Sequence, residues 1–517
     1  MVVPVKLEDR ILTDDFQNGI VPQVPWPYVL WNKNHPLELT IIIPAHNEDR
    51  CIRDTVNSIW KQTIYLSEVC HFKVLVGNDD SEDNTIAEAQ VAGATVINLS
   101  RQGMKAGVID ELLKYVFAWL LLVLDADVKL DPHCLEYLIP PMALPNFLLD
   151  CLARMAIVGD QVVIGAKKVN ELPESLKKLE LLIQEIRTAK TVIFNDGYVI
   201  TAEEFAHLLD TTPLHKVFCA SPYLVPQFRQ TWIEMLRTVQ YIIYLEFRKF
   251  FQNLWTNPFV ASGCCLLMNV PMLNKLGGIR RNHPAEDMHT TVNALLHGWD
   301  NEFVRAAICK PIDPKTLWRL IKQEARWYRG FWWIMREFFF KITRNPGLAF
   351  FVGLTTFEFA MSFLAWLRVA LYLVAWGTKF DIGNIAALYM PKYVMESWLA
   401  SVPNVSVAMF FALGCLVLPA VLIRGWELKI ETKVLVIGWA LYLFTAPLEL
   451  GIFSYSCLMD FVLNIHQKTW TKGHADDIED DQSWRVQIRQ KAKNLLEVIK
   501  TGFGNIRKNG GSKSNGG

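Results

Sequence analysis

Asp125 and Asp127 form an acidic pair directly after the apolar run WLLLVL. In a strand, residues i and i+2 point to the same side, so both carboxylates can face one site at the end of the strand. A hard divalent cation suits such a pair, because it takes carboxylate oxygens together with phosphate oxygens of a substrate. A D-x-D triplet alone is common by chance, but its position after a buried strand predicts a metal and phosphate site.

Other polar groups follow neighbouring apolar runs. Asp79 and Asp80 come after FKVLVGN, where a carboxylate could accept hydrogen bonds from a nucleobase or ribose, or cap the next helix. Pro44 and Glu48 belong to the exit IPAHNE, which directs Glu48 toward the same pocket. Lys105, in RQGMKAG, could contact a phosphate, although a solvated lysine fits the pattern equally well.

Glu286 and Asp287 lie in AEDMHT, where a loop enters a predicted helix. Acidic residues at a helix start often act only as caps. The alternative is that one of them is a general base, which takes a proton from an attacking hydroxyl. The flanking His283 and His289 are expected to be structural.

Gln323, Arg326 and Trp327, in QEARWYRG, share one face if this stretch is helical, because they are spaced i, i+3 and i+4. The guanidinium suits a pyrophosphate, and the indole suits a sugar or a membrane boundary. The face is therefore a candidate acceptor site, with an interfacial membrane helix as the alternative. The upstream acidic clusters favour the acceptor site, and the interfacial role then falls to Trp332 and Trp333.

The elements that would position these residues form an α/β pattern. Short buried strands alternate with helical stretches, which predicts a mostly parallel sheet with ligands beyond the carboxyl ends of its strands. A further strand is expected at ASGCCLLMNV, and the charged, helix-favouring residues 141–250 are interpreted as an elaboration of the same domain. The four runs that predict strands are residues 39–45, 72–78, 94–100 and 119–127.

Three long apolar tracts follow, each long enough to cross a bilayer: residues 347–376, 404–423 and 434–463. They predict a multi-pass integral membrane protein, most simply of the plasma membrane, with three or four spans and a cytosolic catalytic domain. The expected organisation is an irregular segment, a catalytic domain, interfacial amphipathic helices, a transmembrane region and a cytosolic tail, at residues 1–36, 37–317, 318–344, 345–465 and 466–517.

The composition narrows the class of protein. Hydrophobic residues make up 51% of the 517 residues, which fits a membrane protein of two or three units with water-exposed parts. The 52 basic and 52 acidic residues balance, so no nucleic-acid partner is expected. The ten cysteines contain no C-x-x-C pair, which predicts reduced, buried thiols rather than a metal site.

Taken in order, IPAHNE, NDDSEDNT, MKAG, DAD, AED, QEARW and TWTKG resemble the motifs of membrane-embedded, inverting family-two glycosyltransferases that make β-linked polysaccharides. LDADVKLDP is similar to a stretch of hyaluronan synthases, and AED and HQKTWTKG are similar to chitin synthase segments. The resemblance covers about residues 39–473 and implies a GT-A-like fold. The sequence departs from the pattern at Asn78 and Glu324, and it lacks the N-terminal membrane helix pair of hyaluronan synthases.

The resemblance implies a role for each motif. Asp287, next to Glu286, would be the catalytic base, and Asp125 and Asp127 would bind Mg²⁺ or Mn²⁺ with the diphosphate. Gln323 and Trp327 would bind the acceptor. The residues implied to bind the nucleotide sugar are Pro44, Glu48, Asp79 for the uridine (with Asp80 as the alternative), Lys105, Asp125, Arg326, Trp470, Thr471 and Lys472.

The implied activity is processive, inverting polymerisation of a β-linked, hyaluronan- or chitin-like polysaccharide from a UDP-sugar. UDP-N-acetylglucosamine is favoured, because hyaluronan and chitin synthases share it. The polymer would be exported through the membrane helices, so the lipid bilayer would be a partner beside the donor and the growing chain. Two alternatives are single transfer to a polyprenyl phosphate or other lipid, and a transporter or scaffold with a degenerate nucleotide domain.

Overall fold

The coordinates are a computed structural model, which describes residues 26–168, 176–250, 259–281, 283–350, 353 and 417–457. Trp470, Thr471 and Lys472 lie outside the described residues, as do the predicted tail and most of the first two apolar tracts. The domain boundaries expected there stay predictions.

An eight-stranded mixed sheet forms the centre of the molecule, in the order β3-β2-β1-β4-β11-β10-β12-β5. β3, β2, β1 and β4 run parallel, whereas β11 is antiparallel to both of its neighbours and β5 is antiparallel to β12. The strands are β1 (Leu37–Ala45), β2 (Cys70–Asp79), β3 (Thr95–Leu99), β4 (Leu120–Leu124), β5 (Val128–Leu130), β10 (Val217–Leu224), β11 (Cys265–Asn269) and β12 (Asp300–Pro311).

Each strand predicted from an apolar run is present, and the prediction of an α/β domain is confirmed. The sheet is less parallel than expected, because β11 follows a long insertion and pairs with β4 in the opposite direction. β10 and β12 were not predicted as strands, although every residue of β10 is buried. Such a run without alternation does not distinguish a central strand from a buried helix.

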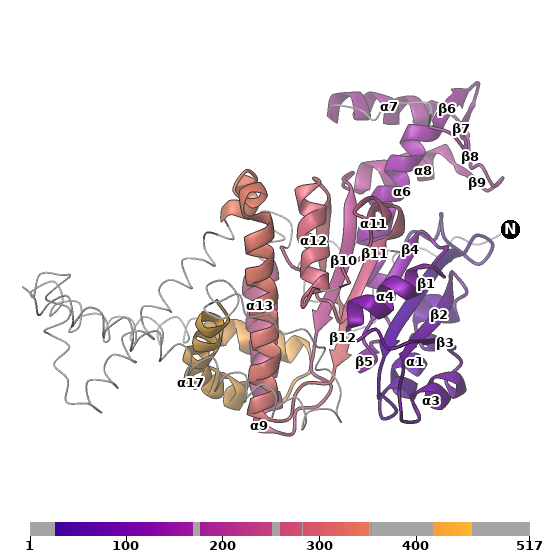
Figure 1. Cartoon of the computed structure of the whole chain (residues 1–517). Coiled ribbons are helices and arrows are strands. Elements are labelled where there is room, and N and C mark those ends of the chain that lie inside the picture. The colour runs from indigo at the N-terminus through magenta and orange to yellow at the C-terminus, as the bar shows by residue number, and fades with distance from the viewer. Residues whose placement is uncertain are drawn as a thin grey trace, which may run out of the picture.

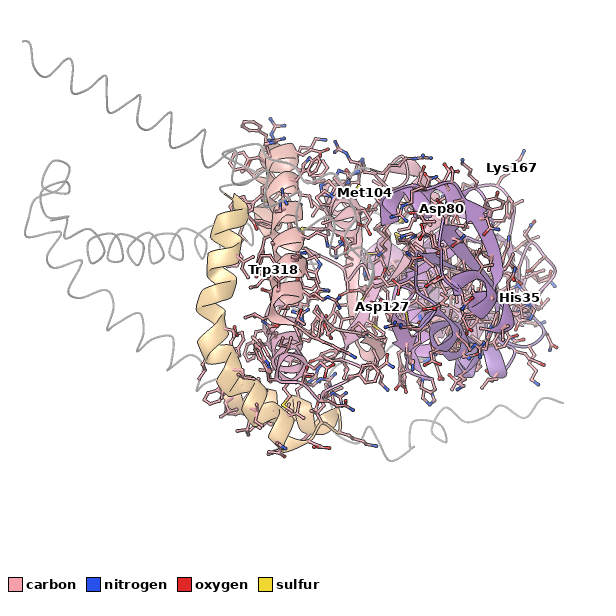
Figure 2. All side chains as sticks on the ribbon, turned by 60° about the horizontal axis from the view of Figure 1, so that its bottom comes forward. His35, Asp80, Met104, Asp127, Lys167 and Trp318 are labelled. Atoms are coloured by element: carbon pink, nitrogen blue, oxygen red, sulfur yellow. The ribbon has the colours of Figure 1, made fainter. Side chains whose placement is uncertain are left out.

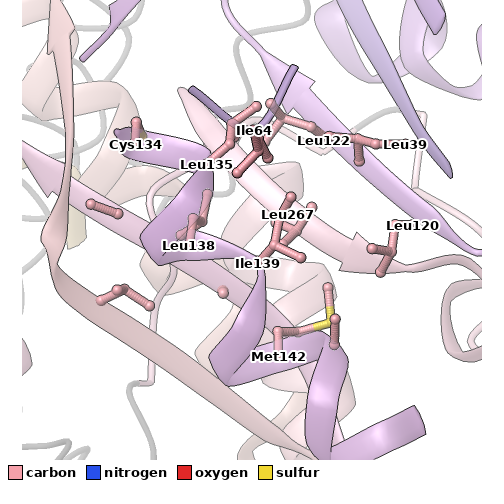
Figure 3. Packing of buried hydrophobic residues seen from close by; sticks show 14 of the residues in the cluster. Leu39, Ile64, Leu120, Leu122, Cys134, Leu135, Leu138, Ile139, Met142 and Leu267 are labelled. Atoms are coloured by element: carbon pink, nitrogen blue, oxygen red, sulfur yellow. The ribbon is translucent and has the colours of Figure 1, made fainter. Parts of the chain in front are cut away.

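Helices cover both faces of the sheet (Figure 1). Side chains of β1 enter both of the hydrophobic layers that result. Leu39, Ile41 and Ile43 of β1 belong to one hydrophobic cluster, and Ile42 belongs to the other. Figure 3 shows the first cluster, where Leu122 and Leu267 meet helical residues such as Leu135 and Met142. This layer contains α1 (Ile52–Trp60), α2 (Thr63–Leu66), α3 (Thr85–Val91), α5 (Cys134–Leu138) and α6 (Pro140–Arg154). The other contains α4 (Lys105–Leu113), α11 (Val270–Lys275) and α12 (Glu286–Leu296).

The first part of the region between residues 141 and 250 builds a small separate sheet. Its strands are ordered β6-β7-β8-β9 and project beyond the main sheet together with α7 (Figure 1). Contacts to the N-terminal segment hold it, because Asn32 donates to the hydroxyl of Tyr198 at 2.6 Å. The elements are β6 (Met155–Val158), β7 (Gln161–Ile164), α7 (Leu176–Thr188), β8 (Thr191–Ile193), β9 (Val199–Thr201) and α8 (Ala202–Thr211).

The QEARW stretch lies on α13 (Leu317–Ile342), a continuous helix that packs on α12 and stands beside it in Figure 1. The contact is close: a Cβ on Gly330 would lie 2.3 Å from the Cβ of Ala285. Trp332 is only 7% exposed and belongs to this packed layer, and the ring of Trp333 lies 5.1 Å from that of His283. Trp332 therefore stabilises the domain rather than contacting lipid headgroups, which corrects that expectation.

Within the described residues, no helix combines the length and the apolar character that a membrane span requires. The prediction of a multi-pass integral membrane protein is wrong on this finding. The helix α17 (Thr432–Cys457) covers most of the third tract, and Val434, Leu435, Leu443 and Ile452 in it are buried. A Cβ on Gly438 would lie 2.3 Å from the carbonyl oxygen of Met235, in α9 (Trp232–Ile243).

Candidate active site

Lys105 connects three segments at the carboxyl end of β4. Its ammonium pairs with Asp125 at 2.8 Å and with Glu286 at 3.3 Å, and it donates to the carbonyl of Gly263 at 2.7 Å. Asp125 is also fixed through its backbone, which donates to the carbonyl of Cys264 at 2.8 Å. Lys105 is 8% exposed, so the alternative of a solvated lysine is wrong. The geometry joins the DAD, MKAG and AED motifs.

Asp127 lies two residues beyond Asp125 and keeps part of its side chain accessible. Its carbonyl accepts from the backbone of Ile312 at 3.2 Å, which ties it to the segment after β12. Figure 2 shows Asp80 and Asp127 on the N-terminal half of the domain and Trp318 on α13. No group of three or more metal-ligand side chains occurs in the described part of the chain. A pair of carboxylates still fits Mg²⁺ or Mn²⁺, because such ions take further oxygens from water and substrate phosphates.

Asp79, at the end of β2, is fully buried. One carboxylate oxygen accepts from the backbone N–H of Gln102, and the other has no hydrogen-bond partner among the described residues. An unpartnered buried acceptor is costly unless a ligand donates to it. Asp80 differs, because its side chain is exposed and its φ of 60° turns the chain away from the strand. Of the two residues, Asp79 therefore has the geometry that fits a hydrogen bond from a nucleobase.

Pro44 and Glu48 lie on the neighbouring strand end. Pro44 is the register partner of Gly77 in β2, so IPAHNE leaves the sheet beside NDDSEDNT. Glu48 is 8% exposed, its backbone donates to the hydroxyl of Thr85 at 2.7 Å, and its carboxylate accepts from the thiol of Cys51 at 3.1 Å. These contacts fix Glu48 in the protein, and they support a positioning role more directly than a contact with the donor.

Asp287 lies against a backbone rather than against a side chain. A Cβ on Gly263 would lie 2.1 Å from its Oδ2 atom, and its Oδ1 atom accepts from the backbone of Met288 at 2.8 Å. Burial raises the pKa of the Asp287 carboxyl and the Glu286 carboxylate raises it further, whereas Lys105 and Arg326 act in the opposite direction. A carboxyl with a raised pKa is a stronger base once ionised, as general-base catalysis requires.

Arg326 and Trp327 lie on α13, the helix that packs on α12. Gly330, which follows QEARW, packs on Ala285 of AED, and the charge of Arg326 lowers the pKa of Asp287. The ring of Trp327 lies 5.2 Å from the guanidinium carbon of Arg237. Gln323 is half-buried, and its Oε1 atom has no hydrogen-bond partner among the described residues. Its carboxamide oxygen is therefore unsatisfied within the described part of the protein.

Beneath this helix lies a buried charged network that the sequence did not reveal. Arg237 of α9 pairs with Asp313 at 3.2 Å and with Glu324 at 3.7 Å, and it donates to Gln240 at 3.1 Å and to the hydroxyl of Tyr241 at 2.9 Å. Burial raises the pKa of the Asp313 and Glu324 carboxyls, and Arg237 counteracts both shifts. Glu324, the departure from the family pattern, thus holds α13 on α9. The stretch QTWIEMLRTVQY predicted a helix, but nothing in it indicated which acidic residues Arg237 would pair with.

His283, His289 and the cysteines have no visible part in the chemistry. The ring of His283 lies 5.0 Å from that of His289 and is completely buried. Cys264, Cys265 and the other cysteines of the described residues are free thiols, which agrees with the expectation of reduced thiols. A small pocket behind the site is lined by Lys105, Gly263, Glu286, Asp287 and Thr290, among others.

No curated protein matches the chain significantly. One solved structure that it resembles is the mannosyltransferase PcManGT from Pyrobaculum calidifontis in complex with GDP-Man and Mn²⁺, with a TM-score of 0.40 and 13% identity over 81% of this chain and 90% of that one.

Two other solved structures are similar. Staphylococcus aureus TarS 1-349 in complex with UDP-GlcNAc gives a TM-score of 0.31 and 15% identity over 60% of this chain and 68% of that one. Glucosyl-3-phosphoglycerate synthase from Mycobacterium tuberculosis in complex with phosphoglyceric acid gives a TM-score of 0.33 and 12% identity over 61% and 85% of the two chains.

The model of the family described as "Glycosyltransferase like family 2" matches residues 35–330. This range contains the whole main sheet and every motif from IPAHNE to QEARW, and it ends within α13. The match confirms that the protein is a glycosyltransferase, and the chain belongs to glycosyltransferase-like family 2.

Proposed function

We propose that the chain transfers a hexose from a UDP-sugar to a hydroxyl of a growing β-linked saccharide, with inversion, and repeats this transfer processively. The observation that carries the proposal is the meeting of three motifs at one carboxylate. Asp287 lies against Gly263 and follows Glu286, the carboxylate that pairs with Lys105. The charge of Arg326 also acts on Asp287. This arrangement combines a base with cations for a diphosphate.

The donor would lie across the ends of β1, β2 and β4. The unpartnered oxygen of Asp79 suits the imide N–H of uracil, which is a donor of matching polarity. Lys105 and Arg326 would bind the diphosphate, since the charges of both act on Asp287. Asp125 and Asp127 would hold Mg²⁺ or Mn²⁺, which supplies charge neutralisation of the leaving diphosphate. The favoured donor, UDP-N-acetylglucosamine, follows from the resemblance to hyaluronan and chitin synthases.

The acceptor would approach from the α13 side. Trp327 offers a flat ring beside Arg237, and Gln323 offers a buried, unpartnered amide oxygen. A sugar ring stacks on an indole and donates its hydroxyls to such an oxygen. The acceptor hydroxyl would then lie next to Asp287.

In the reaction, Asp287 accepts the proton of the acceptor hydroxyl while that oxygen forms a bond to the anomeric carbon of the donor. The bond from the anomeric carbon to the diphosphate oxygen breaks at the same time, and the nucleoside diphosphate leaves with the electron pair. A single displacement inverts the anomeric configuration. Holding base, acceptor and donor together supplies much of the rate increase.

The test uses the purified full-length protein with several UDP-sugars, Mg²⁺ or Mn²⁺ and short oligosaccharide acceptors. UDP release and product length are measured for the wild type, Asp287→Asn and the exposed control Asp160→Asn. We expect Asp287→Asn to lose at least about 1,000-fold in turnover while its UDP affinity stays within about threefold.

Each outcome has a defined meaning. Long products from the wild type support processive synthesis, whereas products extended by one sugar support the single-transfer alternative. Normal turnover by Asp287→Asn would exclude Asp287 as the base. A wild type that releases no UDP with any UDP-sugar would exclude this donor class.

A further inference from the structure

Lys249 is a buried lysine that has no acidic partner in the part of the chain that the structure describes. It lies on the π-helical turn η2 (Tyr244–Phe250) that follows α9, and it is only 2% exposed. Its ammonium donates to the hydroxyl of Ser262 at 2.6 Å, and no carboxylate of the described residues lies within ion-pair distance of it. Because burial of an uncompensated ammonium is unfavourable, this charge needs a functional explanation.

The partner of Lys249 is next to the proposed base. Ser262 binds the ammonium, and the following residue, Gly263, leaves the space that Asp287 occupies. Asp287 is the carboxylate whose charge acts on Lys249. Lys249 and Asp287 thus both contact the segment Ser262–Gly263. Lys105 contacts the same segment, because it donates to the carbonyl of Gly263.

Other groups around the ammonium are neutral or aromatic. The rings of Phe303 and Tyr244 lie 5.7 Å and 5.8 Å from Nζ. Burial lowers the pKa of Lys249 to about 8, and the thiols and the carboxylate near it only partly compensate. Lys249 therefore remains mostly charged at neutral pH. The groups that act on it from the surrounding strands and α12 are Cys219, Cys264, Asp287 and Cys309.

The turn that carries Lys249 is fixed by ion pairs. Glu246 of η2 binds Arg305 at 3.0 Å and Arg424 at 2.9 Å. Isolated π-helical segments often occur at functional sites, where the extra residue directs a side chain inward. Here the side chain directed inward is a cation.

We propose that Lys249 is a positioning residue that keeps Asp287 ionised, and therefore able to act as the base. The inference rests on the proposed function. Burial and Glu286 favour the protonated form of Asp287, which cannot accept a proton from the acceptor. Lys105 and Arg326 act in the opposite direction, but the charge of Lys105 is shared with Asp125 and Glu286. Lys249 adds a cation that pairs with no other carboxylate of the described residues.

The experiment measures kcat/KM for UDP release between about pH 5 and about pH 9 in the wild type, Lys249→Met and Lys249→Arg. In Lys249→Met, the acid limb of the profile should move up by about one pH unit, since an adjacent cation lowers a carboxyl pKa by at least this much. The rate on that limb should fall about tenfold. Lys249→Arg should keep the acid limb of the wild type.

Two controls separate this role from a structural one. The exposed control Lys190→Met removes a charge far from the base and should leave the profile unchanged, since Lys190 pairs with Asp160 on the surface. The Tm of Lys249→Met should not fall, because the variant replaces an unpaired buried charge by an apolar side chain. An unchanged acid limb in Lys249→Met overturns the inference, even if turnover decreases. An inactive wild type instead overturns the proposed function.

Discussion

Gly263 and Asp287 are packed so closely that no side chain fits between them. A Cβ on residue 263 would lie 2.1 Å from Oδ2 and 2.5 Å from Cγ of Asp287. The two residues are far apart in the sequence. The position of Asp287, the proposed base, nevertheless depends on the absence of a side chain at Gly263.

The first prediction concerns this contact. Gly263→Ala should displace the Asp287 carboxylate and reduce sugar transfer about 100-fold, because small misplacements of a catalytic group are costly. The measurement is turnover together with UDP affinity. Gly165→Ala is the matched control, since its Cβ would meet no atom closer than 3.6 Å. Equal losses in the two variants would contradict the prediction.

The second prediction compares the two acids that bind Arg237. Asp313→Asn should lower the free energy of unfolding by about 3 kcal/mol, because it removes the direct partner of a buried guanidinium. Glu324→Gln should change it by less than about 1 kcal/mol, since it removes the second, more distant buried carboxylate. Urea unfolding of both variants tests this difference. A larger loss in Glu324→Gln would show that Glu324 is the essential partner.

The third prediction is a loss of stability in acid. Burial and then the nearby His289 lower the pKa of His283 to about 3 in the folded protein, and its Nδ1 accepts from the backbone of Ala285 at 3.1 Å. Because this value is below the ordinary pKa of about 6.5, the stabilisation is complete above about pH 6.5 and is lost as the pH falls toward about 3. At about pH 5 the loss is about 2 kcal/mol.

The variant His283→Asn should reduce this pH dependence, because asparagine keeps a hydrogen-bond acceptor but cannot titrate. Urea unfolding at about pH 7 and about pH 5 gives the comparison. The exposed His297 provides the control His297→Asn, which should retain the acid sensitivity of the wild type. A difference between the two pH values that is unchanged in His283→Asn would assign the effect to other groups.

The fourth prediction concerns the divalent cation. Removal of the metal with EDTA should abolish UDP release, and added Mg²⁺ or Mn²⁺ should restore it. Asp127→Asn should weaken Mn²⁺ binding in the presence of UDP by at least about tenfold, which calorimetry measures without activity. Asp54→Asn is a control, because Asp54 forms a surface pair with Lys129 at 2.6 Å. Full activity in EDTA would exclude a metal requirement.

The predicted strands were correct where the chain supplied a short apolar run with a polar end, as at Asp79 and Asp125. The membrane prediction was wrong because apolar length does not distinguish lipid contact from helix packing. In α17, which covers most of the third tract, Gly438 packs against Met235 and Val239 of α9. Trp332 illustrates the same limit, because an aromatic residue in an amphipathic helix can face protein instead of lipid.

The sequence by itself determined the α/β class, the order of the motifs and the residue types at each strand end, because these depend on local periodicity and on residues adjacent in the chain. Only the tertiary structure brought Lys105 to Asp125 and Glu286, seated Asp287 against Gly263, and revealed Arg237 and Lys249. The physical reason is that the charge and packing of these groups depend on neighbours distant in sequence. No local pattern specifies which buried cation meets which carboxylate.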